Sequence, residues 1–365
     1  MKTLRRLAIG LAAVVGLLFI FGQPVTWVQS ALVMWDLAAG GAPTLWQEVT
    51  DQPREYPTRW ESGEGDLYLP AGEVRAAMVL VPGAAVLGRD EPRLQALART
   101  FARAGFAILV PELPEVRRLA LSRADGGRVA SALRQLGKWQ PDVPLGVAAI
   151  SYAVGPAIIA ALEDDLTSRV AFLVSIGGYH DMTAAIRFIT TGAFRPMGDS
   201  REFRREPNSY GRWAFLQANA GRLDNADDAR LLQEIARRRG RDSSADITAL
   251  GPQGRAVLAV VDNRDPDAVA ALLAALPENV RREIDGLNLV FYDLSKLRGH
   301  LILVHGQGDP LVPHSESQSL AASASGARVS LFLMDDIGHV EFNAVSLSNA
   351  WTMWRAIVTL LGERN

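Results

Sequence analysis

The sequence predicts an α/β fold in which helices flank a mostly parallel sheet. Two observations support this class. Six short apolar runs have the length and flanking residues of buried strands, and the connections between them show the spacing of amphipathic helices. Alternation of this kind is typical of a parallel sheet with both faces covered.

The predicted strands extend over much of the chain. They cover Ala76–Val81, Phe106–Val110, Pro144–Ile150, Val170–Ile176, Leu301–His305 and Val329–Met334. Most are flanked by Gly, Pro or Asp, which end regular structure. Apolar residues at helical spacing over residues 94–101 and 129–136 predict two of the connecting helices.

One interval, residues 182–298, breaks this alternation and predicts a mainly helical insertion. Its predicted helices cover Tyr210–Asn219, Ala226–Arg239, Asp265–Leu276 and Glu278–Ile284, and Ala256–Val261 is its one run that resembles a strand. The arginines near residues 237–241 are expected to be a solvated helix end.

Composition narrows the function classes. The 365 residues carry 38 basic and 40 acidic side chains, so no global charge favours a nucleic-acid partner. With no cysteine, the chain has no disulfide, thiol nucleophile or Cys-ligated metal. No closely spaced metal-ligand motif and no phosphate-binding loop is present, so we expect neither a metal nor a cofactor.

The N-terminus predicts a targeting or anchoring segment. Lys2, Arg5 and Arg6 precede an apolar stretch that runs, with one interruption, to Trp35. Residues 1–35 are therefore predicted to form a membrane anchor, with the catalytic domain outside the cytoplasm. The alternatives are secretion after cleavage near residues 28–30 and, less favoured, a helix buried against the folded domain.

Ser151 is the first candidate for chemistry. It follows the predicted strand Pro144–Ile150 and precedes an apolar helical stretch. A serine presented on such a sharp turn needs small residues two positions before and after it, usually glycines. Ala149 and Ala153 occupy these positions, which is a weaker form of the motif, and a serine that caps a helix is the competing interpretation.

Two later loops support the catalytic interpretation. Asp309 follows the strand Leu301–His305 in the stretch Gly306–Pro313, and His339 follows the strand Val329–Met334 after Gly338. Catalytic groups of open parallel sheets gather at the carboxyl ends of the strands. The order Ser151, Asp309, His339 is also the order of a serine-hydrolase triad, in which histidine is the base and the acid orients it.

On these motifs, the sequence resembles the α/β-hydrolase superfamily over roughly residues 65–361. The resemblance implies esterase-like or lipase-like chemistry, with Ser151 as nucleophile, His339 as general base and acid, and Asp309 as its orienting acid. It also implies a helical cap at the insertion and an oxyanion hole formed by the backbone N–H groups of Tyr152 and Ala84. Pro82 departs from the family pattern near Ala84, so the second donor stays open to within a residue or two.

Other polar residues lie near the predicted site in the sequence. Asp335 and Asp336 are alternatives to Asp309, although residues so close to His339 in sequence rarely reach the far nitrogen of its ring. His305 is interpreted as a structural residue that could support Asp309. Because it opens the same strand at its far end, His300 is expected to be exposed.

The sequence as a whole predicts four parts: an anchor or signal segment (1–35), a linker (36–59), a hydrolase core (60–181 and 299–365) and a helical cap (182–298). The predicted activity is hydrolysis of a carboxylic ester, for which a hydrophobic acyl group is one option, through an acyl-enzyme. The alternatives are a serine amidase or peptidase, a thioesterase, an acyltransferase, or a non-catalytic binding protein at the membrane. The oligomeric state stays open.

Overall fold

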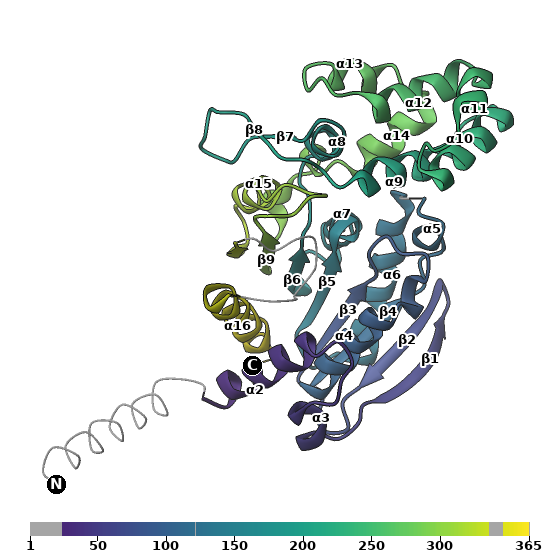
Figure 1. Ribbon diagram of the computed structural model, residues 1–365. Coiled ribbons are helices and arrows are strands. Elements are labelled where there is room, and N and C mark those ends of the chain that lie inside the picture. Colours follow the sequence, from purple (N-terminus) through teal and green to yellow (C-terminus); the bar gives the residue numbers. More distant parts are fainter. Residues whose placement is uncertain (1–23, 121, 336–345, 365) are drawn as a thin grey trace, which may run out of the picture.

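The computed structural model describes residues 24–120, 122–335 and 346–364. At its centre is a sheet of eight strands in the order β1-β2-β4-β3-β5-β6-β9-β10 (Figure 1). The strands are β1 (Arg54–Trp60), β2 (Gly63–Leu69), β3 (Ala76–Val81), β4 (Phe106–Pro111), β5 (Leu145–Ile150), β6 (Val170–Ile176), β9 (His300–Gly306) and β10 (Arg328–Met334).

Six strands of this sheet, β3, β4, β5, β6, β9 and β10, are mutually parallel, whereas β1 and β2 join antiparallel at one edge. The parallel strands include all six that the sequence predicts. Every residue of β3, β4 and β9 is buried, as expected for strands covered on both faces. The predicted mostly parallel sheet is confirmed.

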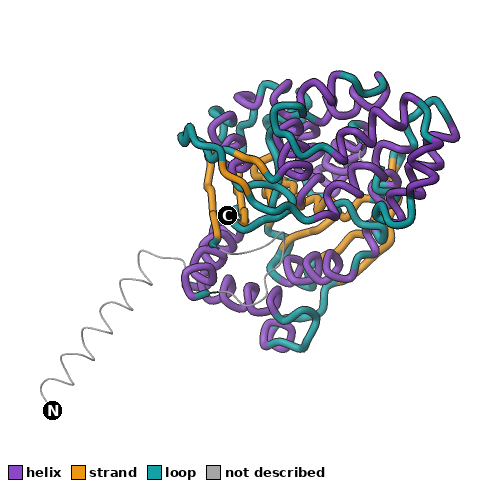
Figure 2. The backbone as a smooth tube through the Cα atoms, turned by 45° about the horizontal axis from the view of Figure 1, so that its top comes forward, coloured by secondary structure: helices purple, strands orange, loops and turns teal. Residues whose placement is uncertain are grey.

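Helices cover both faces of the sheet, as Figure 2 shows with helices in purple and strands in orange. One face is covered by α6 (Ala124–Trp139), α7 (Val154–Ala161) and α15 (Ser315–Ser323), and the other by α2 (Pro24–Ala38), α4 (Pro92–Arg103) and α16 (Leu347–Gly362). Two short helices, α3 (Leu45–Val49) and α5 (Pro114–Arg117), and single turns at Gly88–Asp90, Ser151–Ala153, Leu289–Phe291 and Leu294–Lys296 complete this part.

The core lies in two layers, one on each side of the sheet. Along β3, Ala77 and Val79 pack toward α6, whereas Met78 and Leu80 pack toward α4 and α16. This division follows from the alternation of side chains along a strand. The apolar faces of the helices therefore hold the sheet rigidly, and the loops at its edge are anchored on it.

Between β6 and β9 the chain forms a helical segment with a core of its own (Figure 1). Its helices are α8 (Met182–Thr191), α9 (Ser209–Ala220), α10 (Ala226–Arg238), α11 (Ser244–Ala249), α12 (Pro252–Asp262), α13 (Val269–Ala274) and α14 (Glu278–Leu287), and β7 (Ala193–Phe194) pairs with β8 (Phe203–Arg204).

The strand-like run Ala256–Val261 lies inside α12, so this part of the sequence interpretation is wrong. Pro252 begins the helix, a position where its fixed φ and missing N–H cost little. Val257, Val260 and Val261 are buried together at helical spacing against the other helices of the segment. Tertiary packing therefore overrides the preference of these β-branched residues for strands.

The predicted membrane anchor is contradicted by α2. This helix packs against α16, α3 and α4, and its Val33 is fully buried. Trp27 contacts Trp354 of α16, whose indole N–H donates to the Trp27 carbonyl at 3.0 Å. The second part of the predicted anchor, residues 24–35, thus belongs to the folded domain. The earlier apolar run, Leu7–Gly22, lies outside the described residues.

Asp36 shows why this helix is tied to the domain. Its buried carboxylate accepts hydrogen bonds from the hydroxyls of Thr44 and Thr100, each at 2.5 Å, and from the Gln47 amide at 2.9 Å. Within the described residues, no helix combines the length and hydrophobicity needed to cross a bilayer. The predicted membrane-anchored localisation is therefore wrong, and the proposed cleavage site at residues 28–30 lies within α2.

The stretch predicted as a linker, residues 36–59, carries regular structure. It contains α3 and most of β1, which pairs with β2 along its whole length. Thr44 caps the N-terminus of α3 through a hydrogen bond from Gln47 N. The segment thus connects the N-terminal helix to the edge of the sheet.

Candidate active site

Ser151 stands directly after β5, at the carboxyl end of the sheet. Its φ of 56° lies in the left-handed region, which a residue with a side chain rarely adopts. The chain turns here from β5 into a helical turn and then into α7. A nucleophile elbow requires such a backbone at its serine, and we call this turn the elbow.

The residues around the elbow explain how this sharp turn is accommodated. Ala149 and Ala153, two positions before and after Ser151, are both buried, so a larger side chain at either site would have to displace core atoms. Gly83, in the loop after β3, comes close as well: a Cβ on this residue would lie 3.3 Å from the Ile150 carbonyl oxygen. Small residues are therefore required on both sides of the turn.

Tyr152, whose N–H is one predicted oxyanion donor, also anchors the elbow through its side chain. Its buried hydroxyl lies 3.1 Å from the Ser122 carbonyl and 3.2 Å from Oδ2 of Asp125, on the first turn of α6. Burial raises the pKa of Tyr152 well above its usual value, and the Asp125 carboxyl adds to this. The phenol is therefore neutral, and its role here is to hold the turn.

Ala84, the other predicted oxyanion donor, follows Gly83 in the loop after β3. It is half-buried and packs against the core layer that also contains Tyr152 and Ala153. Because β3 and β5 are neighbours in the sheet, this loop and the elbow lie at the same edge. Gly83, the residue before Ala84, lies beside Ile150, the residue before Ser151.

Asp309 lies three residues after β9 and is almost completely buried. One carboxylate oxygen, Oδ1, accepts the N–H groups of Leu311 at 2.7 Å and Val312 at 3.0 Å. This short turn fixes the orientation of the side chain relative to the backbone. The other oxygen, Oδ2, lies 3.5 Å from Nε2 of His305.

His305 is buried beneath this loop at the end of β9. Nε2 lies 3.0 Å from the Val312 carbonyl, which can only accept, so this nitrogen carries the proton. Nδ1 then accepts from the hydroxyl of Ser317 at 2.7 Å. His305 therefore connects the Asp309 loop to α15, which agrees with the structural role expected from the sequence.

The sheet order brings these loops to one edge. Ile150 of β5 is level with Ile176 of β6, which is level with Val304 of β9. Strands are spaced about 4.8 Å apart, so β5 and β9 lie roughly 10 Å from each other. The next strand, β10, ends level with Gly306 at the same edge. His339, in the stretch that follows β10, lies outside the described residues.

Asp335, one of the alternatives to Asp309, is exposed and has a different set of partners. Its Oδ1 accepts from the side-chain amide of Gln307 at 2.6 Å, and Asn349 of α16 contacts its backbone N–H and carbonyl. It therefore connects the ends of β9 and β10 to α16. The second alternative, Asp336, lies outside the described residues.

Glu316 is a feature of this edge that sequence reasoning missed. Its buried carboxylate accepts the backbone N–H groups of His180 at 3.0 Å and Asp181 at 2.7 Å, where the chain leaves β6 for the helical segment. Burial raises its pKa to about 7, although the two N–H groups act in the opposite direction. No local pattern in the sequence points to it, because the contact depends on how α15 packs.

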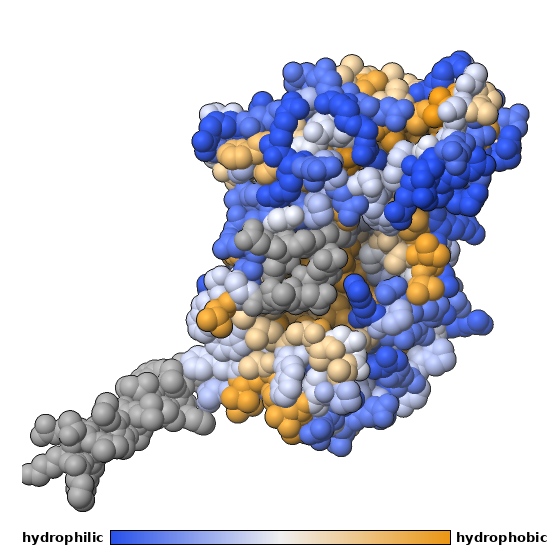
Figure 3. Space-filling view, viewed as in Figure 1, coloured by the Kyte–Doolittle hydropathy of each residue, from blue (hydrophilic) through white to orange (hydrophobic). Residues whose placement is uncertain are grey.

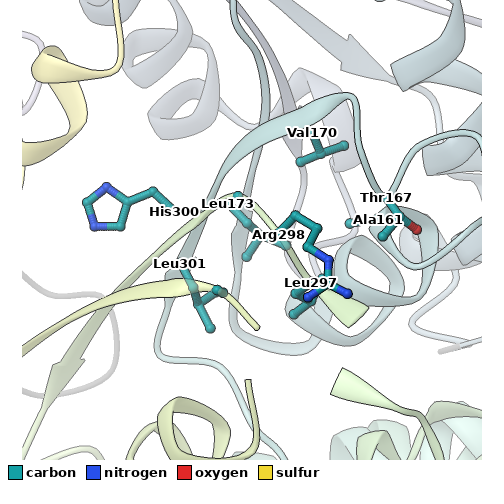
Figure 4. A pocket seen from close by; sticks show the side chains of 10 residues that line it. Ala161, Thr167, Val170, Leu173, Leu297, Arg298, His300 and Leu301 are labelled. Carbon is teal, nitrogen blue, oxygen red and sulfur yellow. The ribbon is translucent and has the colours of Figure 1, made fainter. Parts of the chain in front are cut away.

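The opposite edge of the sheet contains a small cavity that is unrelated to these residues (Figure 4). It lies at the start of β6 and β9, among Val170, Arg298, His300 and their neighbours, and holds about 10 Å³, roughly the space of one water molecule. His300, which the sequence predicted to be exposed, is buried here. Its Nδ1 lies 2.7 Å from the Glu363 carboxylate and its Nε2 lies 2.8 Å from the Ser330 hydroxyl, so both ring nitrogens have hydrogen-bond partners in spite of burial.

Comparison with protein-family models and with curated proteins finds no match for this chain. Solved structures do resemble it. A Legionella pneumophila protein, named as a hydrolase by inference only, is 12% identical, with a TM-score of 0.53 and coverage of 91% of this chain and 94% of that chain.

Two further similar structures are named for an enzymatic activity. An esterase from Pyrobaculum calidifontis is 14% identical, with a TM-score of 0.49 and coverage of 93% and 92% of the two chains. An acylaminoacyl peptidase from Pyrococcus horikoshii is 13% identical, with a TM-score of 0.49, and the match covers 87% of this chain and 41% of the peptidase. This chain thus spans about two fifths of the peptidase's length.

At identities of 12 to 14%, structural similarity is evidence for the fold alone. The similar structures are members of the α/β-hydrolase superfamily. Their architecture agrees with the parallel sheet and the helical layers described above. The chain therefore has the α/β-hydrolase fold.

Proposed function

We propose that the protein is a serine hydrolase that cleaves a carboxylic ester, with Ser151 as the nucleophile. The observation that carries this proposal is the backbone of Ser151, which is held in the left-handed region at the carboxyl end of β5. Strained backbone of this kind is concentrated at functional sites, because it persists only where the surrounding structure enforces it. A serine that merely capped a helix would not need it.

In the proposed acylation step, His339 removes the proton from the Ser151 hydroxyl as Oγ attacks the ester carbonyl. The carbonyl oxygen becomes an oxyanion that accepts from the N–H groups of Tyr152 and Ala84. His339 then gives its proton to the leaving alcohol as the carbon–oxygen bond breaks. Ser151 remains as an acyl ester.

Water completes the cycle. His339 takes a proton from a water molecule, which attacks the acyl-enzyme and forms a second tetrahedral intermediate. Collapse of this intermediate releases the carboxylic acid and returns the proton to Ser151 Oγ. Asp309 holds the imidazole in the required tautomer and stabilises its charged form in both steps.

The placement of Asp309 supports its role as the orienting acid. It is buried and its carboxylate is fixed by two backbone N–H groups, whereas Asp335 is exposed and engaged with Gln307. Hydrogen bonds from backbone N–H groups favour the ionised carboxylate that the role requires. The Asp309 carboxylate is therefore already oriented by the main chain for its proposed role.

An ester is proposed as the substrate class because an alkoxide leaves a tetrahedral intermediate more easily than an amide anion does, so an amide must also be protonated on nitrogen before its C–N bond breaks. An ester therefore makes a smaller demand on the site than an amide. The test compares p-nitrophenyl esters of increasing acyl length with aminoacyl p-nitroanilides, using the full chain. We expect turnover of at least one ester, with higher kcat/KM than any anilide.

Three variants assign the roles. Ser151→Ala should abolish turnover, and Asp309→Asn should lower kcat by about 10³- to 10⁴-fold, because the amide no longer enforces the required tautomer. Asp335→Asn is the matched control and should leave kcat within about twofold. Faster anilide cleavage would replace the ester by an amide substrate, and turnover that survives Ser151→Ala would refute the nucleophile.

A further inference from the structure

A second cavity lies in the helical segment. It has a volume of about 370 Å³ and lies between the end of α8, the stretch after β8, α9 and the loop after α12. Four arginines line it: Arg204, Arg205, Arg212 and Arg264. We call it the arginine pocket. Figure 3 shows mainly hydrophilic side chains over the region of β7 and β8.

The charge of the arginine pocket is strongly positive. Glu206 is the one carboxylate among its lining residues, against four guanidinium groups. Of these four arginines, Arg204 is the one with an ion pair among the described residues, at 3.5 Å from Glu202, and its side chain is largely exposed. Four cations gathered around one cavity repel each other, and an anion inside it would relieve this repulsion.

Two of the arginines are positioned by the main chain. Arg205 donates to the Gln307 carbonyl, and its guanidinium lies 5.6 Å from the ring centre of Phe194. Arg264 donates to the carbonyls of Val261 at 3.0 Å and Asn263 at 2.6 Å. Neutral carbonyls orient these side chains but do not cancel their charge. The positive charge is thus fixed in place and available to a ligand.

Arg212 supplies an independent observation. Its Nε–H is buried and has no hydrogen-bond partner among the described residues. A buried donor without a partner costs free energy, so such groups call for an explanation. Asp262 is near enough for Arg212 to lower its pKa, against the effect of burial, but the two form no ion pair. The Nε–H itself is closed off from solvent, but the Arg212 side chain lines the pocket, so an oxyanion there would lie beside its guanidinium charge.

We propose that the arginine pocket binds a small organic anion that carries phosphate or carboxylate groups. The planar guanidinium presents paired N–H groups that match the oxygens of either group. The volume lies in the range of small-molecule sites and exceeds what one inorganic ion fills. The pocket borders the Asp309 loop through the bond from Arg205 to the Gln307 carbonyl, but none of its lining residues belongs to that loop or to the elbow. Anion binding is therefore proposed independently of the hydrolysis.

Isothermal titration calorimetry on the full chain at low ionic strength tests the proposal, with inorganic pyrophosphate and citrate as probes and sodium chloride as the control anion. One binding site per chain is expected for at least one of the two probes. Tighter binding of pyrophosphate would assign the phosphate class, and tighter binding of citrate the carboxylate class.

Variants tie the binding to the pocket. Arg212→Gln and Arg264→Gln should each weaken binding by about tenfold or more, since each removes a charge-assisted hydrogen bond. Arg230→Gln is the control, because Arg230 is an exposed arginine on α10 outside the pocket. Arg264 is itself exposed, so its variant stays informative if Arg212→Gln fails to fold. Absence of saturable binding, or equal weakening by the control, would overturn the proposal.

Discussion

His305 and Asp309 are coupled at the carboxyl end of β9: Nε2 of His305 lies 3.5 Å from Oδ2 of Asp309 and 3.0 Å from the Val312 carbonyl. The Asp309 carboxylate and the Val312 carbonyl thus both face this buried imidazole. Through Ser317 the same ring reaches α15. The position of the proposed orienting acid therefore depends on a residue four positions before it.

This coupling makes His305 testable as a positioning residue. His305→Phe keeps the ring shape but removes the N–H, which leaves the Val312 carbonyl and the Ser317 hydroxyl without this partner. We expect a loss of about 2–3 kcal/mol in the free energy of unfolding, measured with urea, and a lower kcat with KM nearly unchanged. His305→Gln retains a donor near Nε2 and should recover part of both. Equal stability of the Phe variant and the parent would contradict the assignment.

Strain at the elbow predicts a difference between two inactive variants. The left-handed backbone of Ser151 costs a residue with a Cβ about 1–2 kcal/mol, whereas glycine adopts it freely. Ser151→Gly should therefore be more stable than Ser151→Ala by about 1 kcal/mol in urea unfolding. As a control, Ala153→Gly should destabilise the protein, because φ at Ala153 is −64°. The opposite order of the two Ser151 variants would show that the turn is unstrained.

Glu316 predicts a pH dependence of stability. Its pKa is about 7 in the folded protein against 4.5 for the free side chain, so the folded state binds more protons between these values. Stability therefore falls as pH rises from about 4.5 to 7, by up to about 3 kcal/mol from this group. Glu316→Gln removes this contribution, and its amide oxygen can accept the same two N–H groups, which both donate to Oε2.

Urea unfolding at pH 5 and pH 8 measures the effect. The Gln variant should gain stability over the parent between these two values by an amount on the order of 3 kcal/mol. Comparing Glu316→Gln with the parent at the same pH cancels the contributions of all other titrating groups. A stability difference that is the same at both pH values would show that Glu316 is not protonated in the folded state.

The N-terminal helix can be tested through Asp36. Asp36→Ala removes the acceptor for Thr44, Thr100 and Gln47, and leaves two hydroxyls without it at a buried site. We expect a loss of about 3 kcal/mol in the free energy of unfolding. Asp51→Ala, at an exposed position, should change stability by less than about 0.5 kcal/mol. If both variants unfold alike, α2 does not contribute to the fold.

The sequence predicted the parts of the fold that local pattern controls. Strands β3, β4 and β5 are apolar runs between turn residues, and this pattern results directly from burial on both faces. The antiparallel strand β2 escaped prediction because Gly63, Glu64 and Asp66 interrupt its apolar pattern. It forms by pairing with β4, which no local signal reveals.

Tertiary contacts explain the incorrect predictions. The apolar character of α2 resembles that of a membrane anchor, and its packing on the domain is shown by tertiary contacts such as the bonds of Asp36 and the contact of Trp27 with Trp354. For the candidate site, the ends of β5 and β9 placed Ser151 and Asp309 at one edge, as the strand pattern predicted. The roles of His305 and Glu316 depend on α15, whose packing has no signature in the sequence.

Covalent labelling tests most directly whether Ser151 is an activated nucleophile. The folded full chain is treated with a fluorophosphonate, and intact-mass and peptide mass spectrometry then count and locate the adduct. We expect one adduct per chain, on Ser151, with none in Ser151→Ala and much slower labelling in Asp309→Asn. An unlabelled parent protein, or an adduct that persists in Ser151→Ala, would contradict it.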